Sequence, residues 1–456
     1  MPFLAQIGSL VGIVVTPPIT AMIGYKRTVL FMLIISAGLV CMPFFSKTPQ
    51  MLSAAFALQG IPWGVFQVVS PAYASEVASL QLRPILTTWN NLCWVLGQLL
   101  AAGICKGFET RSDQWGYRVP FAFEWAFTAV LIIAIMFAPE SPYWYLQKEK
   151  TAEAKTAIRK IVRKGAEEAT EAKYALMQHT LCQEKQNETE NASGLQAWAD
   201  IFKGTDRRRT EITATTWIIQ ALCGSALIGW TPTLLQRGGL SNEDSYSFNL
   251  AVMAAGALGT IASWWLMMHV GRQKIYFWGL AAMAAVLLVF GFSSFVSGGI
   301  GGWVAGGIMM LFTVLYDLTV GPICYSLVAE IPAVRRRAAT MSAARGAYLI
   351  ANFFNFFVVP KMTTETADGG WGWGVKSGFL YAAMCGLGAA YAFFRIPSTA
   401  GISAREMDIL FRNKVSARKF SPEEANALDQ NATGFRSMGS NSSVDKPKVV
   451  EKPWEK

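Results

Sequence analysis

Long apolar segments, divided into two groups by one polar stretch, constrain the fold of this chain more than any other feature. The polar stretch runs from Pro139 to Arg209, is rich in Lys, Arg and Glu, and contains no long apolar run. The apolar runs on either side have about 20 residues, the length that a helix needs to cross a bilayer. We therefore predict an all-α polytopic membrane protein with two helical bundles and a charged connector.

The composition supports lipid as the main surroundings of the chain. Of its 456 residues 52% are hydrophobic and 15% are charged, whereas soluble domains carry about a quarter charged residues. The net charge of +10 would also suit a nucleic-acid-binding protein, but the sequence has no basic face and no RNA-binding motif. We expect the lipid bilayer as a partner and no nucleic acid.

Features of enzymes and metal sites are missing from the sequence. The seven cysteines contain no CxxC spacing, and the two histidines, His179 and His269, are far apart. No set of nucleophile and base and no phosphate-binding loop is present. We expect no enzyme activity, no catalytic residues, no metal and no cofactor.

The span-length rule gives about eleven transmembrane helices in four regions of the chain. Residues 1–138 form an N-terminal bundle of five spans, and residues 139–211 form the connector. Residues 212–396 form a C-terminal bundle of six spans, and residues 397–456 form a polar tail that we expect to be largely disordered. The predicted spans are 3–23, 28–45, 51–72, 85–107, 120–138, 212–235, 248–269, 275–295, 303–328, 341–359 and 375–394.

Basic residues determine the predicted orientation. If the connector and the tail are cytoplasmic, the inner loops hold most of the Lys and Arg residues, as the positive-inside rule requires. Five spans before the connector then place the N-terminus outside. Two-halved carriers have six-helix halves built from three-helix repeats. We therefore expect that one helix of twelve is absent at the N-terminus, through a truncated gene model or a natural deletion.

Loop motifs along the chain, in order, resemble one family. The fragments that carry the likeness are GIPWGVFQ at 60–67, YASEV at 73–77, NLCWVLGQ at 91–98, PESPYW at 139–144, GPICY at 321–325, AEIP at 329–332, WGWGVKSGF at 371–379 and VSARKF at 415–420. Together they are similar to the sugar porters of the major facilitator superfamily, in particular the fungal α-glucoside (maltose) permeases. The resemblance implies the major facilitator fold, sugar transport by alternating access, proton symport, and a monomer in the plasma membrane.

Two positions depart from the family pattern, and both lose a carboxylate. Ala21 occupies the place of an aspartate in the loop after the family's second helix, and Ser398 occupies the place of a glutamate after the last span. We expect the absent helix to be the family's first, which carries the proton-coupling acid in many members.

Amide side chains inside the spans are the candidate sugar ligands. The resemblance places Gln98 in a substrate-contacting helix and Gln220 in a glutamine motif beside Ser225. An amide has donors and an acceptor and suits a hydroxyl-covered sugar, but a hydrogen bond between helices is the alternative. The same two interpretations apply to Asn352 and Asn355, which share a helix face.

One acid lies deep inside an apparent span of the second bundle. Intramembrane acids are costly and usually face the interior or a water path. Asp317 could therefore bind a proton or the sugar, or it could have a structural partner.

Charged residues in equivalent loops of the two halves are the candidate gate. We expect Glu76 to act with Arg83, and Glu330 to act with Arg335 and Arg337. Ion pairs there could break and reform in alternating access; the alternative is retention of positive loops with capping acids. Residues that we assign to the same gate at the next inner loop are Gly271 and Arg272.

Other functions remain open at this point. A major facilitator carrier of a secondary metabolite or another small molecule would have the same fold, and the lost carboxylates would allow it. A truncated paralogue that does not transport is the third possibility.

Overall fold

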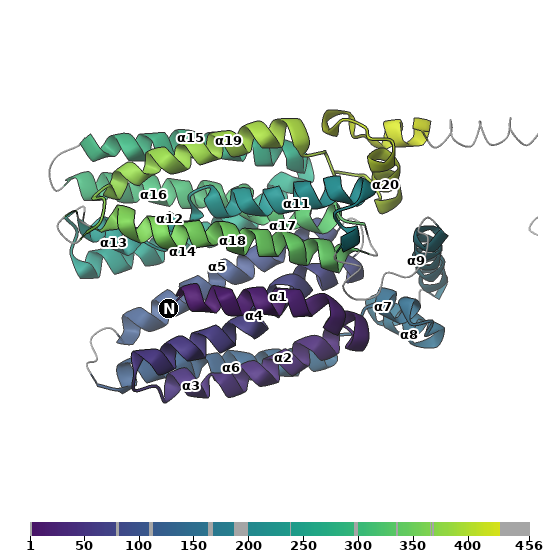
Figure 1. Cartoon of the computed structure of the whole chain (residues 1–456), viewed down its shortest axis with the longest axis horizontal. Helices are drawn as coiled ribbons and strands as arrows, with labels where there is room; N and C mark the ends of the chain where they lie inside the picture. The colour runs from purple at the N-terminus through teal and green to yellow at the C-terminus, as the bar shows by residue number, and fades with distance from the viewer. Residues whose placement is uncertain are drawn as a thin grey trace, which may run out of the picture.

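The computed structural model consists of two helical bundles lying side by side, with further helices at one end (Figure 1). Every regular element in the described part of the chain is a helix. We call the end with the connector helices the connector end and the opposite end the far end. The structure describes residues 2–78, 82–108, 113–162, 167–186, 199–237, 239–295, 300–333, 336–364, 366 and 369–428.

The N-terminal bundle contains four long helices and one helix that is interrupted after its main part. Thr48 starts the longest helix by accepting a hydrogen bond from the backbone N–H of Met51, with Pro49 in the first turn, as is usual for a helix start. The helices of this bundle are α1 (Pro2–Ile23), α2 (Tyr25–Leu39), α3 (Cys41–Phe44), α4 (Pro49–Val77), α5 (Arg83–Phe108) and α6 (Trp115–Phe137).

Small residues bring α1 and α4 into direct backbone contact. A methyl group on Gly12 would clash with the carbonyl oxygen of Ile61, and one on Gly60 would clash with that of Ala5. Gly8 and Gly64 lie one turn away on the same two faces. Lipid is as apolar as the helix surfaces, so the hydrophobic effect does not drive helices together in a membrane. Van der Waals packing at such close contacts stabilises the helix pair instead.

The C-terminal bundle begins earlier than predicted. Its first helix starts at Gly204 rather than at Ile212, so eight residues assigned to the connector belong to a long helix. The helices of this bundle are α11 (Gly204–Leu222), α12 (Ser225–Ile228), α13 (Thr231–Arg237), α14 (Asn242–His269), α15 (Arg272–Phe292), η1 (Ser293–Phe295), α16 (Ile300–Leu318), α17 (Val320–Glu330), α18 (Arg337–Thr363), η3 (Gly374–Lys376) and α19 (Ser377–Arg395).

Two spans that the sequence predicts as continuous are broken. Gly224 has φ 94°, a left-handed conformation that glycine adopts easily, and it separates α11 from α12. Thr319 has φ −123° and ψ −85° and separates α16 from α17. Broken helices leave backbone groups without helical partners, and in transporters these groups commonly form binding sites.

The connector and the first part of the tail form helices at the connector end. The connector holds α7 (Pro142–Gln147), α8 (Thr151–Ile161) and α9 (Glu167–Gln186). We predicted a largely disordered tail, but its described part is ordered and includes α20 (Ala404–Arg412), η4 (Ala417–Lys419) and a helix at 422–428. Residues 429–456 lie outside the described part.

The order in the tail has a local cause. The Ser403 side chain accepts from the backbone N–H of Glu406, whose carboxylate accepts from the backbone N–H of Ser403. This reciprocal arrangement is a capping box that favours a helix start. The apolar side chains of α20 then pack into the core at Leu410 and Phe411.

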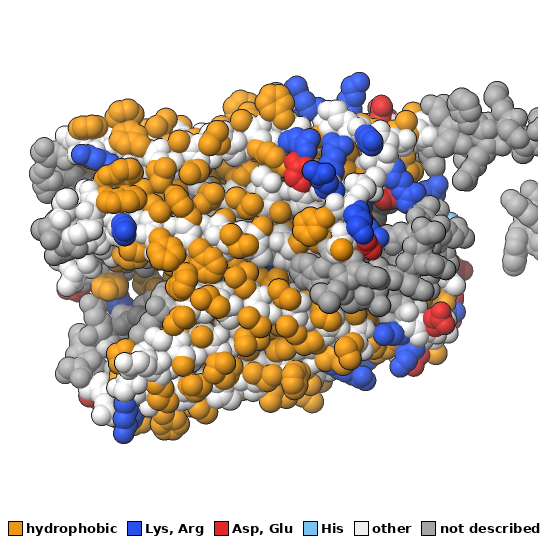
Figure 2. Space-filling model, viewed as in Figure 1, with side chains coloured by type: hydrophobic (Ala, Val, Ile, Leu, Met, Phe, Trp, Pro, Cys, Tyr) orange, Lys and Arg blue, Asp and Glu red, His pale blue; other side chains and the backbone are white. Residues whose placement is uncertain are grey.

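Ten helices in the described part are long and apolar enough to cross a membrane. The predicted span 341–359 lies in α18, which is not among the ten, since Arg345, Asn352 and Asn355 make it more polar. Figure 2 shows apolar side chains covering the flanks of both bundles, while charged side chains gather toward the connector end. The predicted polytopic membrane architecture is confirmed.

Candidate functional site

The two bundles meet along two seams (Figure 1). In one seam α5 packs against α14 and α17, and in the other α1 packs against α18. Aromatic rings pack across both seams. Trp89 stacks on Trp264 with 5.4 Å between ring centroids, and Phe3 lies 5.0 Å from Phe353. A carrier whose halves move must break and remake contacts in these seams.

The two broken helices are joined by an amide. The Gln220 side chain is buried, and its Nε2 donates to the carbonyl of Gly321, just beyond the break at Thr319, at 3.2 Å. The hydroxyl of Ser225 donates to the carbonyl of Gln220 at 2.9 Å across the other break. The two breaks therefore form one polar region inside the C-terminal bundle.

A second amide reaches this region from the opposite bundle. Asn91 on α5 donates from Nδ2 to Oδ1 of Asp317 at 3.0 Å and also to the hydroxyl of Thr260 on α14 at 3.2 Å. Both Asn91 and Asp317 are buried. The structural partner that we offered as an alternative for Asp317 is thus present, and it belongs to the other half of the molecule.

Asn355 bonds to its neighbouring helices. Its amide donates to the carbonyl of Ala221 at 2.8 Å and to Oδ1 of Asn352 at 3.0 Å, and it accepts from the hydroxyl of Tyr381 at 2.8 Å. These bonds connect α11, α18 and α19. They correspond to the second interpretation given for Asn355, a hydrogen bond between helices. Asn352 is only partly buried.

Gln98 lies apart from the buried amides. It is seven residues beyond Asn91, which puts both on one face of α5 about two turns apart, and its side chain is exposed. Gln220 is turned toward the break in α16–α17. Sugar contact by Gln98 stays a prediction.

A buried arginine links the bundles nearer the connector end. Arg345 on α18 donates from Nε to the side-chain oxygen of Gln67 on α4 at 2.7 Å. Its guanidinium lies 4.0 Å from the ring centroid of Tyr348 and 4.4 Å from that of Trp217. The aromatic faces offset part of the cost of burying the charge.

The connector end is closed by contacts between α18 and α4. Arg337, the first residue of α18, donates to the hydroxyl of Ser75 at 3.3 Å and interacts electrostatically with Glu76. The Glu76 carboxylate accepts from the hydroxyls of Tyr25 at 2.9 Å and Ser141 at 2.5 Å. The charged cluster therefore joins the two bundles and the start of the connector.

Glu330 and Arg337, two of the predicted gate residues, have partners other than each other. Glu330 pairs with Arg272 at 3.4 Å, rather than with Arg337, because the end of α17 lies beside the start of α15. Arg337 points across the seam instead. Gly271 precedes α15 as its N-cap without a side-chain cap bond. The side chain of Arg83 and the whole of Arg335 lie outside the described part of the structure.

The connector's first acid, Glu140, binds the N-terminus of α2. Glu140 accepts from the backbone N–H groups of Tyr25 at 2.9 Å and Lys26 at 3.1 Å, so its charge lies at the N-terminus of α2, where the helix dipole favours it. A side chain at Gly24, whose φ is 89°, would collide with this carboxylate.

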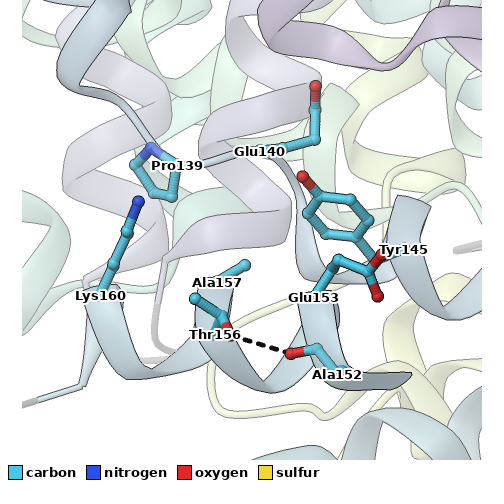
Figure 3. Close-up of a pocket in the computed structure, with 8 residues that line it drawn as sticks. All are labelled: Pro139, Glu140, Tyr145, Ala152, Glu153, Thr156, Ala157 and Lys160. Atoms are coloured by element: carbon cyan, nitrogen blue, oxygen red, sulfur yellow. Dashed lines mark hydrogen bonds between the residues drawn. The ribbon is translucent and has the colours of Figure 1, made fainter. Parts of the chain in front are cut away.

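A cavity of about 240 Å³ at the connector end lies away from both seams. Figure 3 shows it between α8 and the segment that follows α6, with Glu153 and Lys160 at its edge. Glu140, which also lines it, is already engaged with α2. The candidate site is therefore the polar region at the broken helices, not this cavity.

Comparison with known proteins identifies the family. Residues 3–411 match the profile of the family described as "Sugar (and other) transporter". The chain belongs to this family. It is therefore a multi-pass membrane transporter and not an enzyme, as predicted. In the described residues no group of His, Cys, Asp and Glu could hold a metal ion.

The relatives of this sugar transporter family member include two yeast permeases. A general α-glucoside permease of Saccharomyces cerevisiae is 32% identical over 95% of this chain and 70% of its own length. The maltose permease MAL31 of the same organism is 34% identical over 91% of the chain and 67% of its own length.

Solved structures confirm the major facilitator fold. The proton:xylose symporter XylE bound to 6-bromo-6-deoxy-D-glucose gives a TM-score of 0.76 at 20% identity, covering 90% of this chain and 88% of that one. Its inward-open conformation gives a TM-score of 0.63 with the same coverage.

Sequence reasoning did not assign roles to Asn91, Gln67 and Arg345. A signal existed for Arg345, because an arginine inside an apolar span is a functional candidate by itself. Asn91 shares a helix face with Gln98 and could have been found by that spacing. No local pattern indicates that Gln67 would accept from a residue 278 positions away.

Proposed function

We propose that this protein carries α-glucosides such as maltose across the plasma membrane by alternating access. The observation that carries the proposal is the meeting of two broken helices at the seam between the bundles, where amide groups from both halves converge on one break. A polyhydroxylated substrate needs many donors and acceptors at one place. The yeast permeases that resemble the chain over most of its length support the choice of sugar.

The proposed sugar site lies between the broken helices and α18. Gln220 and Ser225 would offer hydrogen bonds to the sugar at the first break, and Asn352 would offer them from the facing helix. Gln98, exposed on the seam face of α5, would contact the sugar from the other bundle. Asn355 has three partners already, so we propose that it positions Asn352 rather than bonding the sugar itself.

The proposed gate is the set of contacts that close the connector end. Arg337 with Ser75 and Glu76, and Arg345 with Gln67, hold α18 against α4. Opening toward the cytoplasm requires these bonds to break. Glu330 and Arg272 lie within one bundle and would keep α15 and α17 moving together. Arg83, Gly271 and Arg335 stay in the proposed gate on the strength of the family resemblance alone.

The proposal also includes the orientation of the protein in the membrane and the coupling of transport to protons. The connector end faces the cytoplasm, because the basic residues gather there (Figure 2). Transport is coupled to protons, a proposal supported by the resemblance to a proton:xylose symporter in fold.

The test is uptake of labelled maltose by cells that lack their own maltose transport. We expect uptake above the empty vector that unlabelled α-glucosides reduce by competition. Surface expression is measured in parallel with a tagged protein. A protein that reaches the surface and takes up none of a panel of sugars would contradict the proposed substrate class.

A further inference from the structure

Asp317 lies where a charge is hardest to accommodate. It is near the middle of the 29-residue span Gly302–Glu330 and in the last turn of α16, directly before the break at Thr319. Only 3% of the residue is exposed. A carboxylate at this depth is costly unless it has a cation or takes up a proton, so it is a functional candidate.

No cation accompanies this carboxylate in the described part of the chain. Among the described residues, Asn91 is the side chain that hydrogen-bonds to it, as a neutral donor. From α14 it is faced by Gly256 and Gly259, neither of which is charged, and Tyr316 on its own helix is a titratable group that interacts with it electrostatically. A structural ion pair therefore does not explain the acid.

The neighbouring helix leaves room for the carboxylate. A methyl group on Gly256 would lie 2.5 Å from Oδ2 of Asp317, and one on Gly259 would lie 3.5 Å from its Cβ. The two glycines are three residues apart and form one small-residue face on α14. This face accommodates an acid, whereas two apolar helices in contact would need no carboxylate there.

The acid is also connected to the other bundle and to the proposed sugar site. Its partner Asn91 belongs to α5, and the side-chain oxygen of Asn91 lies 3.2 Å from where a Cβ on Gly321 would be. The carbonyl of Gly321 in turn accepts from Gln220. A change at Asp317 can thus act both on the seam and on the break that would hold the sugar.

We propose that Asp317 is the proton-binding group that couples transport to the proton gradient, and that Asn91 transmits its state across the seam. The carboxylate takes up one proton from the outer side and becomes a neutral acid, with no other bond made or broken. The neutral acid can be buried against α14, so the seam closes. Loss of the proton toward the cytoplasm restores a charge that requires water, and the seam opens again. This inference rests on the proposed sugar transport.

The test uses the purified full chain in proteoliposomes with labelled maltose. Accumulation driven by an imposed proton gradient reports coupling, and counterflow exchange without a gradient reports sugar movement alone. We expect Asp317→Asn to lose accumulation and sugar-induced proton entry while counterflow stays within about twofold of wild type, because the amide keeps the shape but binds no proton. The matched control is Glu124→Gln, an acid of α6 that pairs with Gln59 inside one bundle. It should accumulate sugar like wild type.

A second variant keeps the test decisive if Asp317→Asn does not fold. Asn91→Val leaves the acid in place and removes its link to α5. We expect counterflow to persist, proton entry to become independent of sugar, and accumulation to fall severalfold.

If Asp317→Asn accumulates maltose as wild type does, the inference is overturned. If Asp317→Asn is inactive in both assays, wild-type accumulation of maltose by Asn91→Val overturns it instead. Equal loss of accumulation in Glu124→Gln overturns it as well. If wild type shows no counterflow of any sugar, the proposed function fails rather than the role of Asp317.

Discussion

Arg345 combines aromatic packing, a buried charge and a hydrogen bond between the two bundles. Its guanidinium is buried between Trp217 and Tyr348 and donates to Gln67 in the opposite bundle. A planar guanidinium can stack on rings and donate in a fixed direction at the same time, which an ammonium group cannot do. Arg345 therefore holds the seam by a geometry that only arginine provides.

Replacing Arg345 by lysine should slow transport although the charge is kept. We expect the initial rate of maltose uptake to fall about tenfold, corresponding to about 1.4 kcal/mol, because the stacked and bonded arrangement is lost. The control is Arg412→Lys, which alters a half-exposed pair with Asp408 within one helix and should leave the rate unchanged. Equal rates for the two variants would show that the guanidinium geometry has no role.

Single residues were the least predictable level of the structure. The sequence pointed to Gln220 and Asp317 as polar groups in apolar spans, and both are buried at the breaks. It could not supply their partners, because Asn91 lies 226 positions from Asp317. Glu330 was expected to pair with arginines of its own loop, but it pairs with Arg272 at the start of another helix.

At the scale of elements, the positions of the helices follow from length and apolarity, and their breaks do not. The sequence predicts 212–235 and 303–328 as single spans, whereas Gly224 and Thr319 interrupt them. Thr319 itself carries no signal for a break, but Pro322 three residues later cannot donate a helical hydrogen bond to the carbonyl of Leu318. The broken segment also lies close to α15, because a methyl group on Gly279 would clash with the Thr319 side chain.

The contact between α1 and α4 should be sensitive to one methyl group. Gly12→Ala places a Cβ against the backbone of Ile61 and should destabilise the protein by about 1–3 kcal/mol, as overpacking does elsewhere. Gly38→Ala on α2 is the control, since no atom lies within 4 Å of the added group. Thermal melting of the purified protein in detergent measures both; indistinguishable melting temperatures would argue against the close helix contact.

The docking of α20 should depend on Phe411. This side chain is 2% exposed, lies 4.8 Å from the Arg209 guanidinium and packs on Phe420. Phe411→Ala should loosen the tail, because removing a buried aromatic side chain costs about 3–5 kcal/mol. Limited proteolysis should then cut the tail at least several times faster than in wild type.

The control for the tail is Lys414→Ala, at an exposed position beyond the helix. An unchanged cleavage rate in Phe411→Ala would mean that the tail is held by other contacts, such as the ion pair between Arg209 and Asp408 at 2.7 Å.

At the scale of the whole molecule, the two-bundle layout was predictable from the polar stretch between two groups of apolar runs. The arrangement of the seams was not, because it depends on which faces of α1, α5, α14 and α18 meet. The connector end is held shut by bonds between α4 and α18, while α5 and α14 carry polar and aromatic contacts along the other seam. Such a molecule can expose a central site alternately to each side if the first set of bonds opens.

The most direct measurement of this central claim is the distance between spin labels on the two bundles at the connector end. Suitable positions are Met22 on α1 and Met268 on α14, both highly exposed and outside the seams, in a background whose seven cysteines are replaced. In wild type we predict a distance distribution dominated by a short, closed distance. When Arg337→Ala and Arg345→Ala remove the proposed gate, a second population at a longer, open distance should appear. Adding maltose to this double variant should change the ratio of the closed and open populations. A single distance that responds neither to these substitutions nor to sugar would contradict alternating access.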